Sequence, residues 1–318
     1  MTDPKGRSSR GPPKVLVIGA AGLDIKGRAA GPLLPGTSNA GSVQRSLGGV
    51  ARNVAENLAR LDVDVTLLTA VGDDTAGRQV MEQAVGCGVD TSPSIVVPGG
   101  RAGAYLAVLD AHGGLSVAID DMSIVESITP RYLNDRRRLF ADASMLAIDA
   151  NLTLAALNTI FSLAAKYNLP VCADPTSTAL AARLCPYLRQ LHLLAPNVAE
   201  AAVLTGQPAT RTQDEALDVA RHLVSLGVGF AILTLADQGS AYATSEESGL
   251  APAMRVDIVD PSGAGDALTA ATIFATLNDI PTDEAVRLGI AAATLTLQSK
   301  ESVHPELSLE KLYAQLAA

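Results

Sequence analysis

The residues with the clearest chemical potential lie in Asp260–Ala270, which reads DPSGAGDALTA. Gly263 and Gly265 allow backbone angles that side chains forbid, so the chain can approach a ligand closely there. A helix expected from Ala264 would present unpaired N–H groups and its positive dipole end, which together favour an anion. Asp266 would add a carboxylate in the first turn. The same residues are also typical of a tight turn with an acidic first helical turn, and this stretch alone does not separate the two interpretations.

A second glycine pair, Gly48 and Gly49, precedes a helix that carries Asn53 in its first turns. Helical spacing puts Asn53 off the apolar face of that helix, so its amide is either solvated or turned toward a ligand. A flat polyhydroxyl ligand would suit the glycine surface. Arg52 is expected at the surface in preference to a contact with an anion. Asp24 follows the first strand, at the edge where ligands of open α/β sheets usually bind.

Two further polar stretches follow buried strands. Asn197 and Glu200 have the spacing of a capping box, which is enough to explain them, but beside a phosphate they would also suit a water-bound Mg²⁺. Thr234 ends a strand and Gly239 lies in the next turn, which alone indicates only strand, turn and strand. The glycines of residues 19–22 lack the G-x-G-x-x-G spacing and precede no helical pattern, so a dinucleotide fingerprint is rejected.

The scaffold for these residues is an alternation of buried strands and amphipathic helices. It predicts an α/β fold with a doubly wound, mostly parallel sheet flanked by helices. Asp257–Asp260 is expected to run as an extended strand into the last glycine motif, because Pro261 disfavours a helical conformation at Asp260. Two segments, about 24–49 and 94–121, have the composition of exposed strands and turns. We expect them to pair as a small β-lid over one edge of the domain.

One domain is expected from residue 14 to residue 318, after a flexible tail over residues 1–13. The tail lacks the apolar run of a secretory signal, and no apolar segment is long enough to span a bilayer. The formal charge of −9 argues against nucleic acid or an anionic membrane as partner. Three widely spaced cysteines suggest neither a disulfide framework nor a zinc site. We therefore expect a soluble protein of the cytoplasm.

The order of these motifs along nearly the whole chain resembles the ribokinase-like (PfkB) family of sugar and nucleoside kinases. The resemblance implies a kinase that uses ATP and Mg²⁺, and it implies that Asp266 is the base that takes a proton from the acceptor hydroxyl. The other implied site residues are Gly263, Ala264 and Gly265 in the anion hole, Asp24, Gly48, Gly49 and Asn53 on ribose hydroxyls, Asn197 and Glu200 on the Mg²⁺–phosphate side, and Thr234 and Gly239 beside the nucleotide.

Within the family, the segments Thr37–Leu61 and Ala104–Met122 most resemble the pseudouridine kinase subgroup. This resemblance implies transfer of the γ-phosphate to the 5′-hydroxyl of pseudouridine. The alternatives are a ribokinase or another sugar kinase, and, from another class, a non-catalytic ligand-binding protein on the same fold. Polar lid residues would contact the base, namely Ser38, Asn39, Tyr105, Asp120 and Asp121, with Asp121 as the candidate acceptor for the extra ring N–H of pseudouridine.

Three further expectations come with the resemblance. Asp260 and Ser262 match the family's D-x-T cation-binding element, which implies activation by K⁺; Ser262 replaces the common Thr but keeps the hydroxyl. Ala236 stands where the nucleotide loop often has Gly, which puts the geometry of that loop in question. The β-lid is also the surface through which a homodimer would form.

Overall fold

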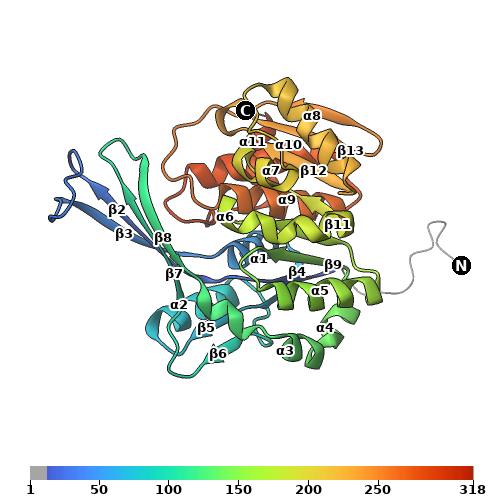
Figure 1. The fold of residues 1–318 in the computed structure, drawn as a ribbon, viewed down its shortest axis with the longest axis horizontal. Helices are drawn as coiled ribbons and strands as arrows, with labels where there is room; N and C mark the ends of the chain where they lie inside the picture. The colour runs from blue at the N-terminus through green and yellow to red at the C-terminus, as the bar shows by residue number, and fades with distance from the viewer. Residues whose placement is uncertain (1–12, 318) are drawn as a thin grey trace, which may run out of the picture.

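The computed structural model describes residues 13–317, so residues 1–12 of the expected tail lie outside the described residues. Its main sheet has the strand order β14-β13-β12-β11-β10-β9-β1-β4 (Figure 1). All pairings are parallel except those of β13 with β12 and β14. From one edge to the other, the strands are β14 (Ser248–Ala251), β13 (Ser240–Thr244), β12 (Phe230–Thr234), β11 (Leu191–Leu194), β10 (Val171–Asp174), β9 (Met145–Asp149), β1 (Lys14–Ile18) and β4 (Asp64–Leu68).

Helices cover both faces of this sheet, which confirms the predicted fold class. The α-helices are α1 (Val50–Arg60), α2 (Thr75–Gly86), α3 (Pro130–Asp135), α4 (Arg137–Asp142), α5 (Leu154–Tyr167), α6 (Thr178–Ala181), α7 (Val198–Thr205), α8 (Gln213–Ser225), α9 (Ala264–Leu277), α10 (Thr282–Leu297) and α11 (Leu309–Ala317). Three 3₁₀ segments join them, η1 (Ser123–Ser127), η2 (Ala182–Gln190) and η3 (Ala236–Gln238). Over residues 13–317, no helix combines the length and apolar character needed to cross a membrane.

The two faces of the sheet carry separate cores because successive side chains of a strand point to opposite sides. Val15 and Val17 of β1 pack with buried residues of α1, α9 and α10. Leu16 and Ile18 pack on the other face with buried residues of α3, α4 and α5. Because both faces are buried, the strands contain nearly continuous apolar runs, and these runs made the alternation readable in the sequence.

A second sheet projects from the body of the molecule, at the left of Figure 1. Its strands, in the order β3-β2-β7-β8, are β3 (Gly41–Gly48), β2 (Gly22–Ala29), β7 (Gly103–Leu109) and β8 (Leu115–Asp121). It joins the two segments expected to form the β-lid, and we call it the lid sheet. One strand of the expected lid segments lies outside the lid sheet. β6 (Ile95–Val97) pairs with β5 (Ala70–Gly72), and Ile95 packs against the core on the Leu16 face of the main sheet.

The prediction of a strand at Asp257–Asp260 is wrong. Residues 252–263 belong to no strand, and Ile258 and Val259 are exposed. Their backbone runs beside the end of α10, where the N–H groups of Val259 and Asp260 donate to the carbonyl of Leu297 at 2.8 and 3.3 Å. Since β14 already forms the edge of the sheet and ends at Ala251, this segment passes outside the sheet before it reaches α9.

Candidate active site

The start of α9 has the backbone geometry that the glycine motif predicts. Gly263 precedes the helix with φ 79°, a left-handed conformation that favours glycine. A Cβ atom on Gly263 would come within 1.8 Å of the carbonyl oxygen of Ser302, so a side chain would not fit. A Cβ on Gly265 would meet nothing within 4 Å among the described residues, so the backbone there faces open space. This open, N–H-rich helix start is suited to an anion.

Asp266 lies in the first turn of α9 and is buried. Its Oδ2 accepts a hydrogen bond of 2.7 Å from Nδ2 of Asn53, which comes from α1, 213 residues earlier. Burial, together with the negative charges of Asp24 and Asp149, raises the pKa of Asp266 to about 7 against the effect of the Asn53 hydrogen bond. A carboxyl group with this pKa can accept a proton near neutral pH.

Arg52 fixes the orientation of the Asn53 amide, which corrects the expectation that Arg52 lies at the surface. Arg52 is only 2% exposed. Its guanidinium forms an ion pair with Glu56 and donates to the Asn53 Oδ1 at 3.0 Å. Because the Asn53 oxygen accepts from Arg52, its Nδ2 is left to donate to Asp266. The Arg52 charge therefore lies inside the molecule. Because it is buried, it requires an oppositely charged partner, which Glu56 provides.

Asp24 enters the same site from β2. Its carboxylate is buried against Gly48, where any Cβ would lie about 2.3 Å from Oδ1, and it accepts a hydrogen bond from Ser302 at 3.3 Å. Burial raises the pKa of Asp24, and the neighbouring Lys26 and the Ser302 hydrogen bond oppose this shift. Gly49 has φ 93°, and a Cβ there would meet Ala21 at 2.5 Å. Gly48 thus leaves room for the Asp24 carboxylate, and Gly49 allows the start of α1 to approach the backbone of Ala20 and Ala21.

Two further carboxylates at this edge, Asp149 (buried) and Asp174 (half-buried), were not among the expected site residues. Asp149 ends β9 and accepts from the backbone N–H groups of Ala20, Asn151 and Ala51 at 2.7, 2.9 and 3.2 Å, so it ties the end of β1 to the start of α1. Asp174 ends β10, and its pKa is raised well above the usual range by burial and by the charges of Asp266 and Glu200. Their signal in the sequence was an Asp at the end of each buried strand.

Asn197, Glu200 and Thr234 lie at the ends of the next strands. Asn197 and Glu200 form a complete capping box on α7, so the structural explanation of their spacing holds. Glu200 is also buried, which raises its pKa. Thr234 is bridged to Asn197, and its N–H donates to the Pro196 carbonyl at 3.0 Å. The capping box therefore does not exclude Asn197 and Glu200 from the site, since both lie at the same edge of the main sheet as Asp174.

The turn after Thr234 has two left-handed residues. Gly239 has φ 93°, and a Cβ would come within 2.1 Å of the Ala251 carbonyl oxygen, so glycine is required by the neighbouring strand β14. Ala236 has φ 52°, a conformation unfavourable for a residue with a side chain. Ala236 therefore holds a left-handed conformation that glycine could adopt without this strain.

The expectation for Asp121 is wrong. In the lid sheet, Asp120 pairs with Tyr105, which pairs with Asp24, so these three share the face toward the site. Asp121 pairs with Ala104 and belongs to the opposite face, where its carboxylate accepts from the Ser123 hydroxyl at 2.7 Å. The proximity of Asp24 and Asp120 contributes, after burial, to raising the pKa of Tyr105. Of the two adjacent carboxylates at the end of β8, Asp120 is therefore the one on the site face.

The donor set at this edge fits Mg²⁺ held mainly through phosphates and water. Among residues 13–317, no three His, Cys, Asp or Glu side chains gather as a metal site of their own. Glu200 and Asp174 nevertheless lie close enough for the charge of Glu200 to raise the pKa of Asp174. This excess of carboxylates is what a divalent cation and its waters would neutralise, because Mg²⁺ usually takes one or two carboxylates beside substrate phosphates.

The residues expected to hold K⁺ do not fit a cation. Both carboxylate oxygens of Asp260 accept from Nζ of Lys26, at 2.8 and 2.7 Å, and Oδ1 also accepts the Ser262 N–H at 2.9 Å. A potassium ion at this carboxylate would lie next to an ammonium group of the same charge. The correction follows from Lys26, whose position beside Asp260 could not be read from the D-x-S motif.

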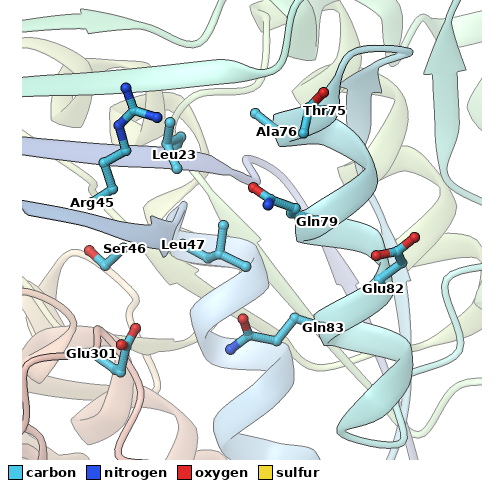
Figure 2. A pocket seen from close by; sticks show the side chains of 10 residues that line it. All are labelled: Leu23, Arg45, Ser46, Leu47, Thr75, Ala76, Gln79, Glu82, Gln83 and Glu301. Atoms are coloured by element: carbon cyan, nitrogen blue, oxygen red, sulfur yellow. The ribbon is translucent and has the colours of Figure 1, made fainter.

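A cavity lies outside this site. It has a volume of about 790 Å³ and is lined by residues of β3 and α2, among them Arg45, Leu47 and Gln79 (Figure 2). Leu47 pairs with Leu23 in the lid sheet, and both belong to the face opposite Asp24. Asp24, Asn53 and Asp266 do not line this cavity, so it is separate from the candidate active site.

Comparison with known proteins shows the family of the chain. Residues 12–308 match the pfkB family of carbohydrate kinases, and the chain belongs to that family. The chain is similar to a pseudouridine kinase of Escherichia coli, with 33% identity over 93% of this chain and 94% of the relative. It is 32% identical to an uncharacterized sugar kinase of the same organism, over 93% of this chain and 81% of the relative. A solved carbohydrate kinase from Agrobacterium tumefaciens is 30% identical, with TM-score 0.80, over 96% of this chain and 97% of that chain.

Proposed function

We propose that this protein transfers the γ-phosphoryl group of ATP to the 5′-hydroxyl of pseudouridine. The observation that carries the proposal is Asp266, a buried carboxyl group with a pKa of about 7, at the open N-terminus of α9 and within one hydrogen bond of Asn53. A base beside an anion-binding helix start is the arrangement that phosphoryl transfer to an alcohol requires. The choice of pseudouridine is supported by the 33% identity to a pseudouridine kinase.

In this proposal, each part of the site has one task. Asp24 and Asn53 hold the ribose so that its 5′-hydroxyl faces Asp266, which accepts the hydroxyl proton as the new P–O bond forms. The backbone N–H groups of Gly263, Ala264 and Gly265 face the charge that develops on the γ-phosphoryl oxygens. Bound Mg²⁺ supplies charge neutralisation on the phosphates, near Asn197 and Glu200. The nucleotide lies between Thr234 and Gly239.

The lid sheet supplies the contact that would select the base. Pseudouridine carries one more ring N–H than uridine, because its sugar is attached through carbon. Asp120 shares the site face with Tyr105 and Asp24, so it is the acceptor that we assign to this N–H. Asp120 is exposed, although partial burial and the charge of Asp121 raise its pKa, so a base bound against it would exclude water from this carboxylate. Loss of a ligand N–H at such an acceptor costs about 1–3 kcal/mol.

A sugar kinase is the second candidate, and the 32% identity to an uncharacterized sugar kinase favours it. A binding protein without catalysis is a weaker alternative, because a pure binder needs no base at Asp266. ADP release over a panel of pseudouridine, uridine, adenosine, ribose and fructose separates the three. We expect release with pseudouridine and a product phosphorylated at the 5′ position by ³¹P NMR. Release with ribose but not pseudouridine would establish the sugar kinase, and no release with any acceptor would favour the binding protein.

The same panel applied to Asp120→Asn tests the base contact. Asn can still accept through its amide oxygen but loses the charge, so we expect a loss of about tenfold in kcat/KM for pseudouridine. Uridine and ribose should lose less than about threefold, because they lack the N–H in question. Asp121→Asn is the matched control from the opposite face of the same strand. Equal losses for all acceptors in Asp120→Asn would remove Asp120 from base selection.

A homodimer through the lid sheet belongs to the proposal as well. The face of the lid sheet that points away from the active site carries four exposed apolar side chains, Val43, Leu106, Val117 and Ile119. An exposed apolar sheet face is typical of an interaction surface. A second copy of the chain, with the same face, would cover it by two-fold pairing.

A further inference from the structure

The ion pair between Lys26 and Asp260 joins two parts of the molecule that are 234 residues apart. Lys26 lies on β2, two residues after Asp24 and on the same face of the lid sheet. Its ammonium group donates to both oxygens of Asp260, and the two side chains are only 10% and 11% exposed. Asp260 begins the loop that leads through Ser262 and Gly263 into α9. The pair therefore connects the lid to the anion-binding loop.

The Lys26 ammonium group occupies the position at the Asp260 carboxylate where a bound cation would lie. Asp260 Oδ1 holds the loop by accepting the Ser262 N–H at 2.9 Å, and this carboxylate needs a positive partner because a buried charge without one is costly. Lys26 supplies that charge covalently. Asp24 lies on the same face, and the Lys26 charge lowers the pKa of Asp24 against the effect of burial. A diffusible cation would meet an ammonium group already in position.

We propose that the Lys26 ammonium group is a built-in monovalent cation that holds the anion-binding loop, so that this enzyme needs no K⁺. Since Lys26 belongs to the lid, the charge that holds the loop is in place only when β2 lies beside Asp260. The inference rests on the proposed kinase activity for its rate measurement. Its stability measurement does not depend on the acceptor or on catalysis.

The test compares wild type with Lys26→Met in KCl and in tetramethylammonium chloride at equal ionic strength. For wild type, we expect the same melting temperature and kcat in both salts. For Lys26→Met, we expect a lower melting temperature and a loss of about tenfold or more in kcat in tetramethylammonium, because Asp260 loses its partner. KCl should restore part of both, since a small cation can then reach the carboxylate. Lys26→Arg keeps the charge and should remain insensitive to K⁺.

The control is Lys14→Met, whose ammonium group lies 3.9 Å from an exposed Asp64 and should affect neither measurement. Activation or stabilisation of wild type by K⁺ over tetramethylammonium would overturn the proposal. Full activity of Lys26→Met with no response to K⁺ would also overturn it. If Lys26→Met does not fold, the wild-type and Lys26→Arg measurements decide. If no acceptor is phosphorylated, the function fails, but the melting temperatures still test the cation.

Discussion

At the scale of single residues, the account depends on Asp266 and on the pKa that burial gives it. The carboxyl group lies 2.7 Å from Asn53, and Asn53 is turned by Arg52, so a chain of three side chains sets the direction of one base. After burial, the negative charges of Asp24 and Asp149 also help to raise the pKa of Asp266 to about 7.

Asp266→Asn should lower kcat by about 10²–10⁴, because general-base catalysis contributes that much. The amide is nearly isosteric, so the dissociation constant for the nucleoside, measured by calorimetry, should change less than about threefold. Asp121→Asn provides the control, since Asp121 lies on the far face of the lid. A kcat near the wild-type value in Asp266→Asn would show that Asp266 is not the base.

The pH dependence follows from the same group. Only the deprotonated carboxylate can accept a proton, so kcat/KM should fall about tenfold per pH unit below a pKa of about 7 and level off above it. The measurement is kcat/KM between pH 5.5 and 9 with saturating ATP and Mg²⁺. A profile that stays flat down to pH 5.5 would contradict a base with a raised pKa.

The raised pKa also affects stability. Folded Asp266 holds its proton up to about pH 7, whereas the unfolded chain releases it near its ordinary value of 3.8. The native state therefore binds more protons between these values, and this group lowers the free energy of unfolding as pH rises from about 4 to 7. Asp266→Asn removes that loss, so it should unfold at a higher temperature than wild type at pH 8 and show a smaller difference at pH 5. A difference that is equal at both pH values would contradict the raised pKa.

At the scale of elements, the turn between β12 and β13 holds a local strain at Ala236, the residue that put the geometry of this loop in question. Ala236 adopts φ 52°, which costs about 1 kcal/mol for a residue with a side chain. Ala236→Gly should therefore raise the free energy of unfolding by up to about 1 kcal/mol, after the greater freedom of glycine in the unfolded chain is subtracted. Urea denaturation measures it, with Ala314→Gly in the exposed face of α11 as a control that should lower stability. A destabilised Ala236→Gly would contradict the strain.

Element patterns were the most predictable part of the structure. The buried strands follow from apolar runs. The starts of α1 and α9 follow from Gly48, Gly49 and Gly263, because the backbone conformation at a turn depends on the residues of that turn. The side-chain network was not predictable. Which of Asp120 and Asp121 faces the site depends on strand register, since a shift of one residue reverses the face. The contact of Lys26 with Asp260 depends on how the lid lies on the body, which no local pattern encodes.

At the scale of the whole molecule, the lid sheet has two different faces. One carries Asp24, Tyr105 and Asp120 over the active site, and the other exposes apolar side chains. If two chains pair through the second face, Ile119→Glu should convert the dimer to a monomer in sedimentation velocity, because a charge buried at an interface is costly. Val85→Glu, at an exposed position of α2, is the control and should leave the mass of the dimer unchanged. A monomeric wild type at micromolar concentration would contradict the dimer.

The most direct test of the proposed function is kcat/KM for pseudouridine, uridine and ribose under identical conditions. The account predicts that pseudouridine exceeds uridine by about tenfold or more, because uridine leaves the Asp120 acceptor unpaired at a cost of about 1–3 kcal/mol. Ribose, which reaches only Asp24, Gly49 and Asn53, should be weaker still. A kcat/KM for ribose equal to that for pseudouridine would contradict the nucleoside assignment and leave a sugar kinase in its place.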